Sequence, residues 1–171
     1  MKYIIVTGIF MKVNPFLRVI IVFSAVFFIL SAQNRAYGQS EELVNFKNVI
    51  GTWSLVYGND YGYSFRFGKN YRAVIILYLN TSSIIFKGIY TIEEKGILRV
   101  NVSEMKREEK IKNLNTRSGF NKAKSSYFIF QGRHITEESG KFLELRTVKI
   151  SIDGNDSEGF FEPLVKLEKE K

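Results

Sequence analysis

The stretch from Gly51 to Leu79 reads GTWSLVYGNDYGYSFRFGKNYRAVIILYL and carries the clearest signal of the fold. Its central segment, YSFRF at 63–67, alternates aromatic with polar residues. A period of two indicates a half-buried β-strand, because successive side chains of a strand point to opposite faces. Glycine-containing clusters at 58–60 and 68–70 flank this segment and are typical of tight turns. The stretch therefore predicts three strands joined by two turns.

The same rhythm continues toward the C-terminus. Eight strand candidates follow from it, at 51–57, 63–67, 71–79, 84–92, 97–103, 125–131, 142–150 and 160–167. Tight turns join most of them, which favours an antiparallel meander. A meander of this length closes on itself because closure removes its exposed edges. We therefore predict an all-β fold, an antiparallel eight-stranded meander closed into a barrel, after a short helical lead-in at 40–49, where apolar residues recur at helical spacing.

The segment before residue 39 has the features of a targeting sequence. Lys12 and Arg18 precede an uncharged apolar run at 19–32, and the small residues of Ala36-Tyr37-Gly38 follow it. This order is the signature of a cleaved signal peptide, and the run is shorter than the roughly 20 residues that span a bilayer. We expect residues 1–38 to be a signal peptide, with Met11 as an alternative start and an uncleaved anchor as the other interpretation. The domain at 39–171 is then exported, either periplasmic or secreted.

Charge and composition narrow the classes of partner. Four of the 25 Lys and Arg residues precede residue 39, whereas all 17 Asp and Glu residues follow it, so the net charge falls from +8 to +4 without that segment. The basic character is thus partly a targeting feature, and we expect no nucleic-acid partner. The chain has no cysteine and one histidine, which argues against a zinc or redox-metal site. We expect no metal and no cofactor.

A polar segment at 104–124 interrupts the strand rhythm. It holds seven Lys and Arg residues against three Glu residues, so it carries the whole positive excess of the exported part. We expect an insertion in the barrel, partly helical at 105–114. Its basic residues are candidates for contact with an anionic partner such as lipopolysaccharide, a glycosaminoglycan or anionic lipid, above all Lys106, Arg107, Lys110 and Lys112. The alternative is a solvated loop.

Aromatic residues dominate the positions predicted to face the barrel interior. As candidates for lining a ligand pocket we take Trp53, Tyr57, Tyr63, Phe65, Phe86, Tyr90 and Tyr127, with Phe67 beside them. Such residues form an apolar pocket whose phenol groups orient a ligand. The alternative is a packed aromatic core, since an eight-stranded barrel is just wide enough for its own side chains or for one small ligand.

No catalytic constellation is visible in the sequence. His134 stands alone after a turn, and no Ser-His-Asp set or phosphate-binding glycine loop can be assembled. The run from Asp153 to Glu158 begins like a calcium loop, but Leu164 occupies the twelfth position, where such a loop needs glutamate. A hairpin turn is the favoured interpretation of that run. We therefore expect a protein that is not an enzyme.

Three motifs in order resemble a known family: GTW at 51–53, FRFGKNY at 65–71 and FKGIYTIEEKGILRV at 86–100. They resemble the lipocalin-like, calycin-type domains of small exported bacterial proteins. The resemblance implies a barrel with Trp53 at its base, under a basic residue of a late strand, for which Lys149 and Lys166 are the candidates. It also implies room for an apolar small molecule, in a family that includes members with filled interiors.

Two functions follow as expectations. The first is a non-enzymatic exported binding protein that holds a small apolar ligand inside the barrel. The second is a surface interaction protein that uses the basic segment at 104–124. An eight-stranded outer-membrane barrel is a third interpretation, but charged residues such as Arg66, Lys87 and Arg99 fall on the predicted outer face. We therefore expect a domain that does not span the membrane after the signal is removed.

Overall fold

The computed structural model describes residues 40–58, 61–109 and 119–171. All of them belong to one compact unit, Gln39–Lys171. The expected signal peptide lies outside the described residues, as do Lys110 and Lys112 of the basic segment.

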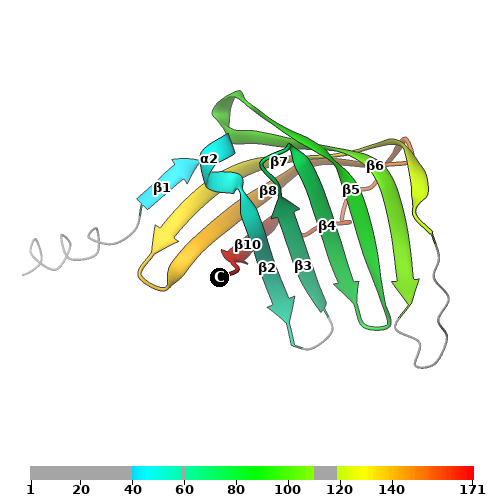
Figure 1. Ribbon diagram of the computed structural model, residues 1–171, viewed down its shortest axis with the longest axis horizontal. Helices are drawn as coiled ribbons and strands as arrows, with labels where there is room; N and C mark the ends of the chain where they lie inside the picture. The colour runs from blue at the N-terminus through cyan, green and yellow to red at the C-terminus, as the bar shows by residue number, and fades with distance from the viewer. Residues whose placement is uncertain (1–39, 59–60, 110–118) are drawn as a thin grey trace, which may run out of the picture. The chain divides into compact units, whose positions relative to one another are not determined.

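Eight antiparallel strands close into a barrel (Figure 1). In chain order they are β2 (Gly51–Tyr57), β3 (Tyr61–Phe67), β4 (Arg72–Leu79), β5 (Ser82–Glu93), β6 (Ile97–Glu109), β7 (Asn121–Glu137), β8 (Gly140–Ile152) and β10 (Leu164–Lys169). Each strand from β2 to β8 pairs with the next, and β10 pairs with both β8 and β2. This last pairing closes the ring, so the predicted closed all-β barrel is confirmed.

Short elements decorate the barrel. β1 (Ser40–Leu43) pairs with β7, and β9 (Asn155–Asp156) pairs with β8. α2 (Phe46–Val49) is a single helical turn capped by Asn45, whose side chain accepts hydrogen bonds from the backbone amides of Lys47 and Asn48. The helical lead-in predicted for 40–49 is therefore wrong for its first part, because strand pairing with β7 takes up residues 40–43.

The basic segment at 104–124 is not an insertion throughout. β6 continues to Glu109 and β7 begins at Asn121, so the prediction of a helix is wrong for residues 105–109. The cause is a β-bulge: Val102 pairs with Gly88 and Glu104 with Lys87, which leaves Ser103 as an extra residue on β6. A bulge shifts the phase of the side chains after it. The two-residue period is thus broken in the sequence although the strand continues.

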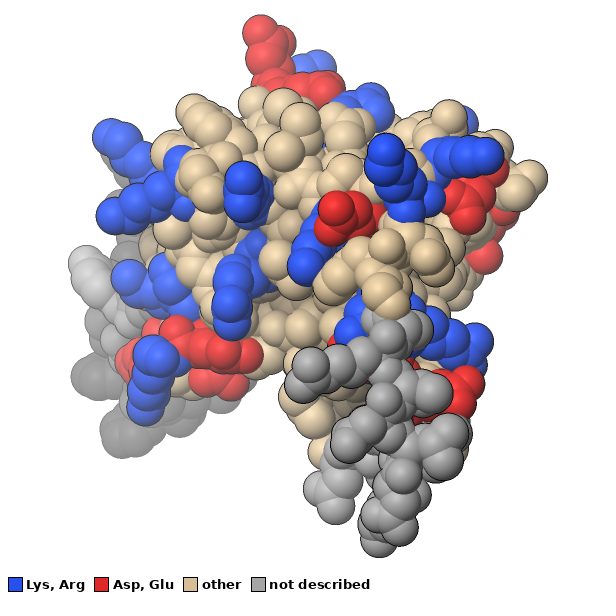
Figure 2. Space-filling view, turned by 45° about the vertical axis from the view of Figure 1, so that its right-hand side comes forward, with Lys and Arg blue, Asp and Glu red and all other residues tan. Residues whose placement is uncertain are grey.

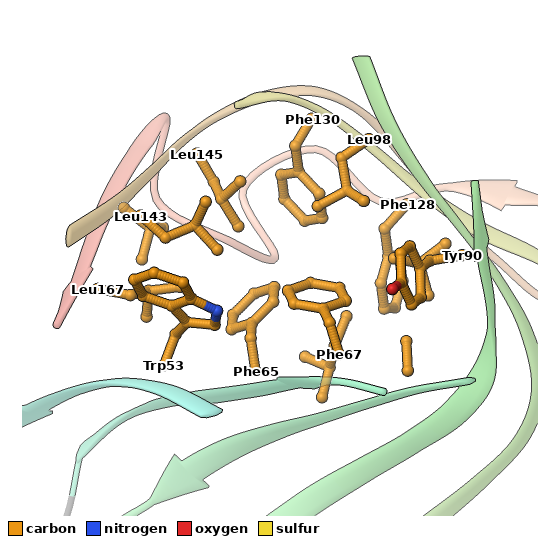
Figure 3. Packing of buried hydrophobic residues seen from close by; sticks show 14 of the residues in the cluster. Trp53, Phe65, Phe67, Tyr90, Leu98, Phe128, Phe130, Leu143, Leu145 and Leu167 are labelled. Atoms are coloured by element: carbon orange, nitrogen blue, oxygen red, sulfur yellow. The ribbon is translucent and has the colours of Figure 1, made fainter. Parts of the chain in front are cut away.

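Apolar side chains from opposite walls meet in the interior (Figure 3). Trp53, Phe65 and Phe67 project from β2 and β3, and Phe130, Leu143 and Leu145 face them from β7 and β8. All six side chains are almost completely buried. Aromatic pairs with centroids about 5–7 Å apart and edge-to-face geometry stabilise such cores beyond the burial of their area. Phe65 and Phe130 are one such pair, with centroids 5.9 Å apart.

Candidate functional site

The barrel has a closed end, the base, next to α2. Trp53 is fully buried there, and its indole Nε1 donates a hydrogen bond to the Val49 carbonyl of α2 at 2.6 Å. The Lys169 ammonium group lies 4.9 Å from the centre of the Trp53 ring system, within the range of a cation–π contact. The basic residue over Trp53 is therefore Lys169 and not Lys149 or Lys166. The family resemblance made Lys166 a candidate, but its ammonium group binds the Glu137 carboxylate at 2.8 Å and lies over Phe142.

His134 belongs to this base. Its ring meets Trp53 edge-on, with centroids 5.8 Å apart. Burial lowers the pKa of His134 below 6.5, although the Glu42 carboxylate opposes this effect. No group of three or more His, Cys, Asp or Glu side chains gathers in the part of the chain that the structure describes. The contacts of His134 are those of a packed side chain at the base.

A connection that the sequence did not reveal fills the interior. We call residues 157–163, between β9 and β10, the strap. The prediction of a strand starting at residue 160 is wrong for 160–163, because β10 begins only at Leu164. Phe161 of the strap is 2% exposed and points into the barrel. Its ring lies 5.2–5.9 Å from those of Tyr63, Phe65, Phe128 and Phe130.

Backbone hydrogen bonds fasten the strap at both ends. The Ser157 amide donates to the Ile150 carbonyl at 3.0 Å. At the other end, the hydroxyl of Thr147 donates to the Glu162 carbonyl at 2.8 Å, and the Thr147 amide donates to the Pro163 carbonyl at 3.0 Å. With both ends held by β8, Phe161 is fixed in place as a plug between the two walls.

The predicted pocket residues do not share one pocket. Trp53, Phe65, Phe86 and Tyr90 are at most 2% exposed and belong to the packed core. The Tyr90 hydroxyl donates to the Gly68 carbonyl at 2.9 Å, so it is used within the fold. Of the seven candidates, the structure thus assigns four to the core, and the alternative of a packed interior describes them best.

Tyr127 is on the wrong face for a pocket residue. Ser126 and Phe128, which flank Tyr127 in the strand, are buried, so Tyr127 points outward, and the Arg99 guanidinium lies 5.4 Å from its ring centre. Both faces of this strand carry large apolar residues in the sequence, with Tyr127 and Ile129 on one and Phe128 and Phe130 on the other. A two-residue period alone therefore does not show which face of this part of β7 points into the barrel.

An apolar cavity opens at the other end of the barrel, which we call the mouth. It has a volume of about 270 Å³. Five apolar side chains line it, from β5, β6, β8 and the strap: Ile84, Phe86, Met105, Ile152 and Phe160. Three polar residues complete the lining: Lys106, Arg107 and Asn121. Among the predicted pocket residues, only Phe86 contributes to this cavity.

A second, smaller cavity at the mouth has a volume of about 180 Å³. Tyr57 and Tyr63 line it together with Glu162, and Phe160 is shared with the first cavity. The Tyr57 hydroxyl donates to the Glu162 carboxylate at 3.2 Å. Burial, followed by the nearby Glu162 charge, raises the pKa of Tyr63. Phe160 thus separates an apolar cavity with cationic neighbours from a tyrosine-lined cavity with an acidic one.

The candidate residues for an anionic partner are divided between two faces. Arg107 pairs with Ile84 and Lys106 with Ile85, so the two neighbours point to opposite sides of β6. Arg107 shares the inner face with Met105, and its Nη2 lies 3.4 Å from the hydroxyl of buried Ser82. The ammonium group of Lys106 binds the Glu108 carboxylate at 2.5 Å. A single basic cluster containing both side chains is therefore excluded.

The acidic run after β8 forms a hairpin. Asp153 and Gly154 connect the paired residues Ile152 and Asn155, and both have positive φ, at 51° and 82°. This is the geometry of a two-residue turn with an Asp-Gly sequence. The Asp153 carboxylate accepts hydrogen bonds from the Lys124 amide at 3.0 Å and from the Ser126 hydroxyl. The Asp153 Oδ1 atom thus connects the turn to β7 through these hydrogen bonds.

Comparisons with family models, curated proteins and solved structures found no match to this chain. Within residues 40–58, 61–109 and 119–171, no helix has the length and apolar character to cross a membrane. The class supported so far is that of a closed, eight-stranded antiparallel β-barrel. The candidate functional site of this barrel is its mouth, where the two cavities lie.

Proposed function

We propose that this protein is an exported, non-enzymatic binding protein of the lipocalin-like type that takes a small apolar ligand at the mouth of its barrel. The observation that carries the proposal is the apolar cavity lined by Ile84, Phe86 and Phe160. Ligand sites are concave and mainly apolar, with a few polar groups at fixed positions. The placement of Trp53 beneath Lys169 at the base supports the lipocalin-like assignment.

The ligand site is at the mouth because Phe161 occupies the middle of the barrel. Besides Phe160, four aromatic rings from the barrel walls surround Phe161 at contact distance, so a ligand in the centre would have to displace it. The cavity of about 270 Å³ lies just below the 300–1,000 Å³ that is typical of ligand pockets. A small ligand therefore fits the site better than a bulky one.

Binding of an uncharged dye tests this proposal. Nile red is titrated into the purified protein, and we expect saturable enhancement of its fluorescence. The substitution Ile84→Phe fills the cavity and should weaken dye binding at least tenfold. Its matched control is Ile85→Phe, which adds the same ring on the outer face of the same strand. Equal binding by both variants, or no saturable binding by the wild type, would refute the proposal.

Export is tested separately from ligand binding. N-terminal sequencing of the protein recovered from outside the cytoplasm should begin at Gln39, after the Ala36-Tyr37-Gly38 sequence. Recovery of the chain with residues 1–38 intact, in the cytoplasm, would contradict that part of the proposal.

A second candidate function is contact with an anionic surface, and a row of five outer-face residues that includes three cations, Arg66, Lys87 and Lys122, favours it. Arg66 pairs with Val74, Val74 with Lys87, Lys87 with Glu104, and Glu104 with Lys122, which places these residues side by side across β3 to β7. Neighbouring strands lie about 4.8 Å apart, so the row spans about 19 Å. Figure 2 shows Lys and Arg side chains distributed over the face of the molecule that is turned forward in that view.

Retention on a heparin column at low and high salt tests the second candidate. Neutralising Arg66, Lys87 and Lys122 to glutamine should lower the salt concentration of elution, since exposed charges are screened by salt. A matched triple variant at Lys95, Lys141 and Lys171, which are outside the row, should change elution less. If the two triple variants lower the salt concentration of elution equally, net charge alone explains the retention. That result would refute contact with an anionic surface through this row.

A further inference from the structure

We infer that the ligand of the mouth carries one anionic head group, which Arg107 holds at the rim while the apolar part of the ligand lies against Phe86, Met105 and Phe160. This inference rests on the proposed function and names the chemical class of its ligand: a small single-chain amphiphile with an anionic head group. It is carried by the position of a guanidinium group beside an otherwise apolar cavity.

The strand register aims Arg107 at the cavity. Met105 pairs with Phe86 and Arg107 with Ile84, so all four residues lie on the inner face of the β5–β6 pair. The contact of Arg107 Nη2 with the hydroxyl of Ser82, which is 2% exposed, agrees with this direction. A guanidinium has five N–H donors in a planar fork, so it binds a carboxylate in a bidentate manner while it keeps other contacts.

The charges around the two cavities point to an anion in the first. The lining of the larger cavity holds Lys106 and Arg107 and no Asp or Glu. The lining of the smaller cavity holds Glu162 and no Lys or Arg. Because the Lys106 side chain points to the outer face, an anionic head group in this cavity meets the Arg107 guanidinium, whereas in the smaller cavity it would meet the Glu162 carboxylate. A ligand whose apolar tail is buried in the cavity and whose anionic head group lies at the rim matches both the apolar side chains and the guanidinium of the lining.

The arrangement also explains why a charge would matter for affinity. A cavity of about 270 Å³ buries only a short apolar chain, so apolar contact alone gives weak binding. Hydrogen bonds to charged groups are stronger than neutral ones, by an amount that corresponds to roughly tenfold in affinity. The anionic ligand should thus outcompete an uncharged ligand with the same chain.

Displacement of Nile red by decanoate and by decanol, at pH 8, tests the inference. We expect decanoate to displace the dye at a concentration at least tenfold lower than decanol. Arg107→Gln should abolish this preference, whereas Arg107→Lys should keep part of it because the charge remains. The matched control is Arg99→Gln, which removes the same group from the outer face of β6, where it pairs with Glu93.

The outcomes separate this inference from the proposed function. Equal displacement by decanoate and decanol in the wild type would leave an apolar site and overturn the anionic head group. If Arg107→Gln prefers decanoate as strongly as the wild type does, the assignment of the head group to Arg107 is also overturned, because another residue must then bind the carboxylate. Failure of Nile red, decanoate and decanol alike to bind would remove the proposed function itself. Circular dichroism of each variant verifies that the barrel is folded.

Discussion

The base and the mouth of the barrel differ in how they are built. At the base, Trp53 contacts α2, Lys169 and His134, and the elements that meet there close the end of the barrel. At the mouth, one connection, the strap, supplies both Phe161, which plugs the interior, and Phe160, which divides two cavities. An end closed by interlocking side chains is therefore suited to stability, whereas an end covered by one strap has surface left for a ligand.

The largest expected effect comes from removing the plug. Phe161→Ala deletes a buried ring that contacts five other rings, and cavity formation at such sites destabilises proteins by about 3–5 kcal/mol. Urea denaturation followed by circular dichroism measures the loss. If the variant remains folded, it should also bind larger apolar dyes than the wild type does, because the interior is then open to the mouth.

The neighbouring residue is the control for the plug. Phe160 is only partly buried, so Phe160→Ala should cost less stability than Phe161→Ala. Because Phe160 lines both cavities, its removal should join them and favour longer ligands over shorter ones. Equal destabilisation by the two substitutions would mean that the strap acts as a single packed unit, and the contrast between base and mouth would fail.

A smaller effect is expected at the base. Trp53→Phe keeps an aromatic ring but removes the donor to the Val49 carbonyl, and an unsatisfied buried acceptor costs about 1–3 kcal/mol. The variant should unfold at a correspondingly lower urea concentration. No measurable loss would show that the carbonyl finds another donor and that α2 does not depend on Trp53.

The lone tryptophan also reports on Lys169. Trp53 is the only tryptophan of the chain, so its emission is specific to the base. Lys169→Gln removes the cation 4.9 Å from the ring and should shift that emission, whereas Lys171→Gln at the exposed C-terminus should not. Ligand binding at the mouth should leave the emission unchanged, because Trp53 does not line either mouth cavity.

The smallest expected effect is a pH dependence at the base. Burial lowers the pKa of His134 in the folded state below its ordinary value of 6.5, so the unfolded chain binds the proton first as the pH falls. The stability that neutral His134 contributes is full above pH 6.5 and decreases from there down to the lowered folded pKa. Chemical denaturation between pH 5 and 8 measures this slope. His134→Gln should flatten it, and an unchanged slope would assign it to other groups.

Strand identity could largely be read from the sequence, whereas the direction of side chains could be read only in part. The alternation at Tyr63, Phe65 and Phe67 involves polar residues between the rings, so the inner face was clear. Around Tyr127 both faces are apolar, and the choice was wrong. After Ser103 the bulge reversed the phase, and a continuing strand looked like an insertion. The pattern is informative only where its two faces differ in polarity.

The candidate site could not be assembled from the sequence. Arg107 was identified as a basic residue, but its position beside Phe86 depends on the register of β6 after the bulge. Phe160 and Phe161 were assigned to a strand, since nothing in the residues FFEP reveals that they turn into the barrel. A connection between strands is positioned by what it packs against, and that information is not local.

Local alternation and turn chemistry are enough to predict an all-β chain with glycine-rich turns, an aromatic interior and Trp53 at the start of the first barrel strand. Three contacts are visible only in the folded barrel: Lys169 covers Trp53, Phe161 fills the centre and Arg107 faces an apolar cavity. These contacts join residues that are far apart in the chain. Their formation depends on strand register and closure, which no short stretch of residues specifies.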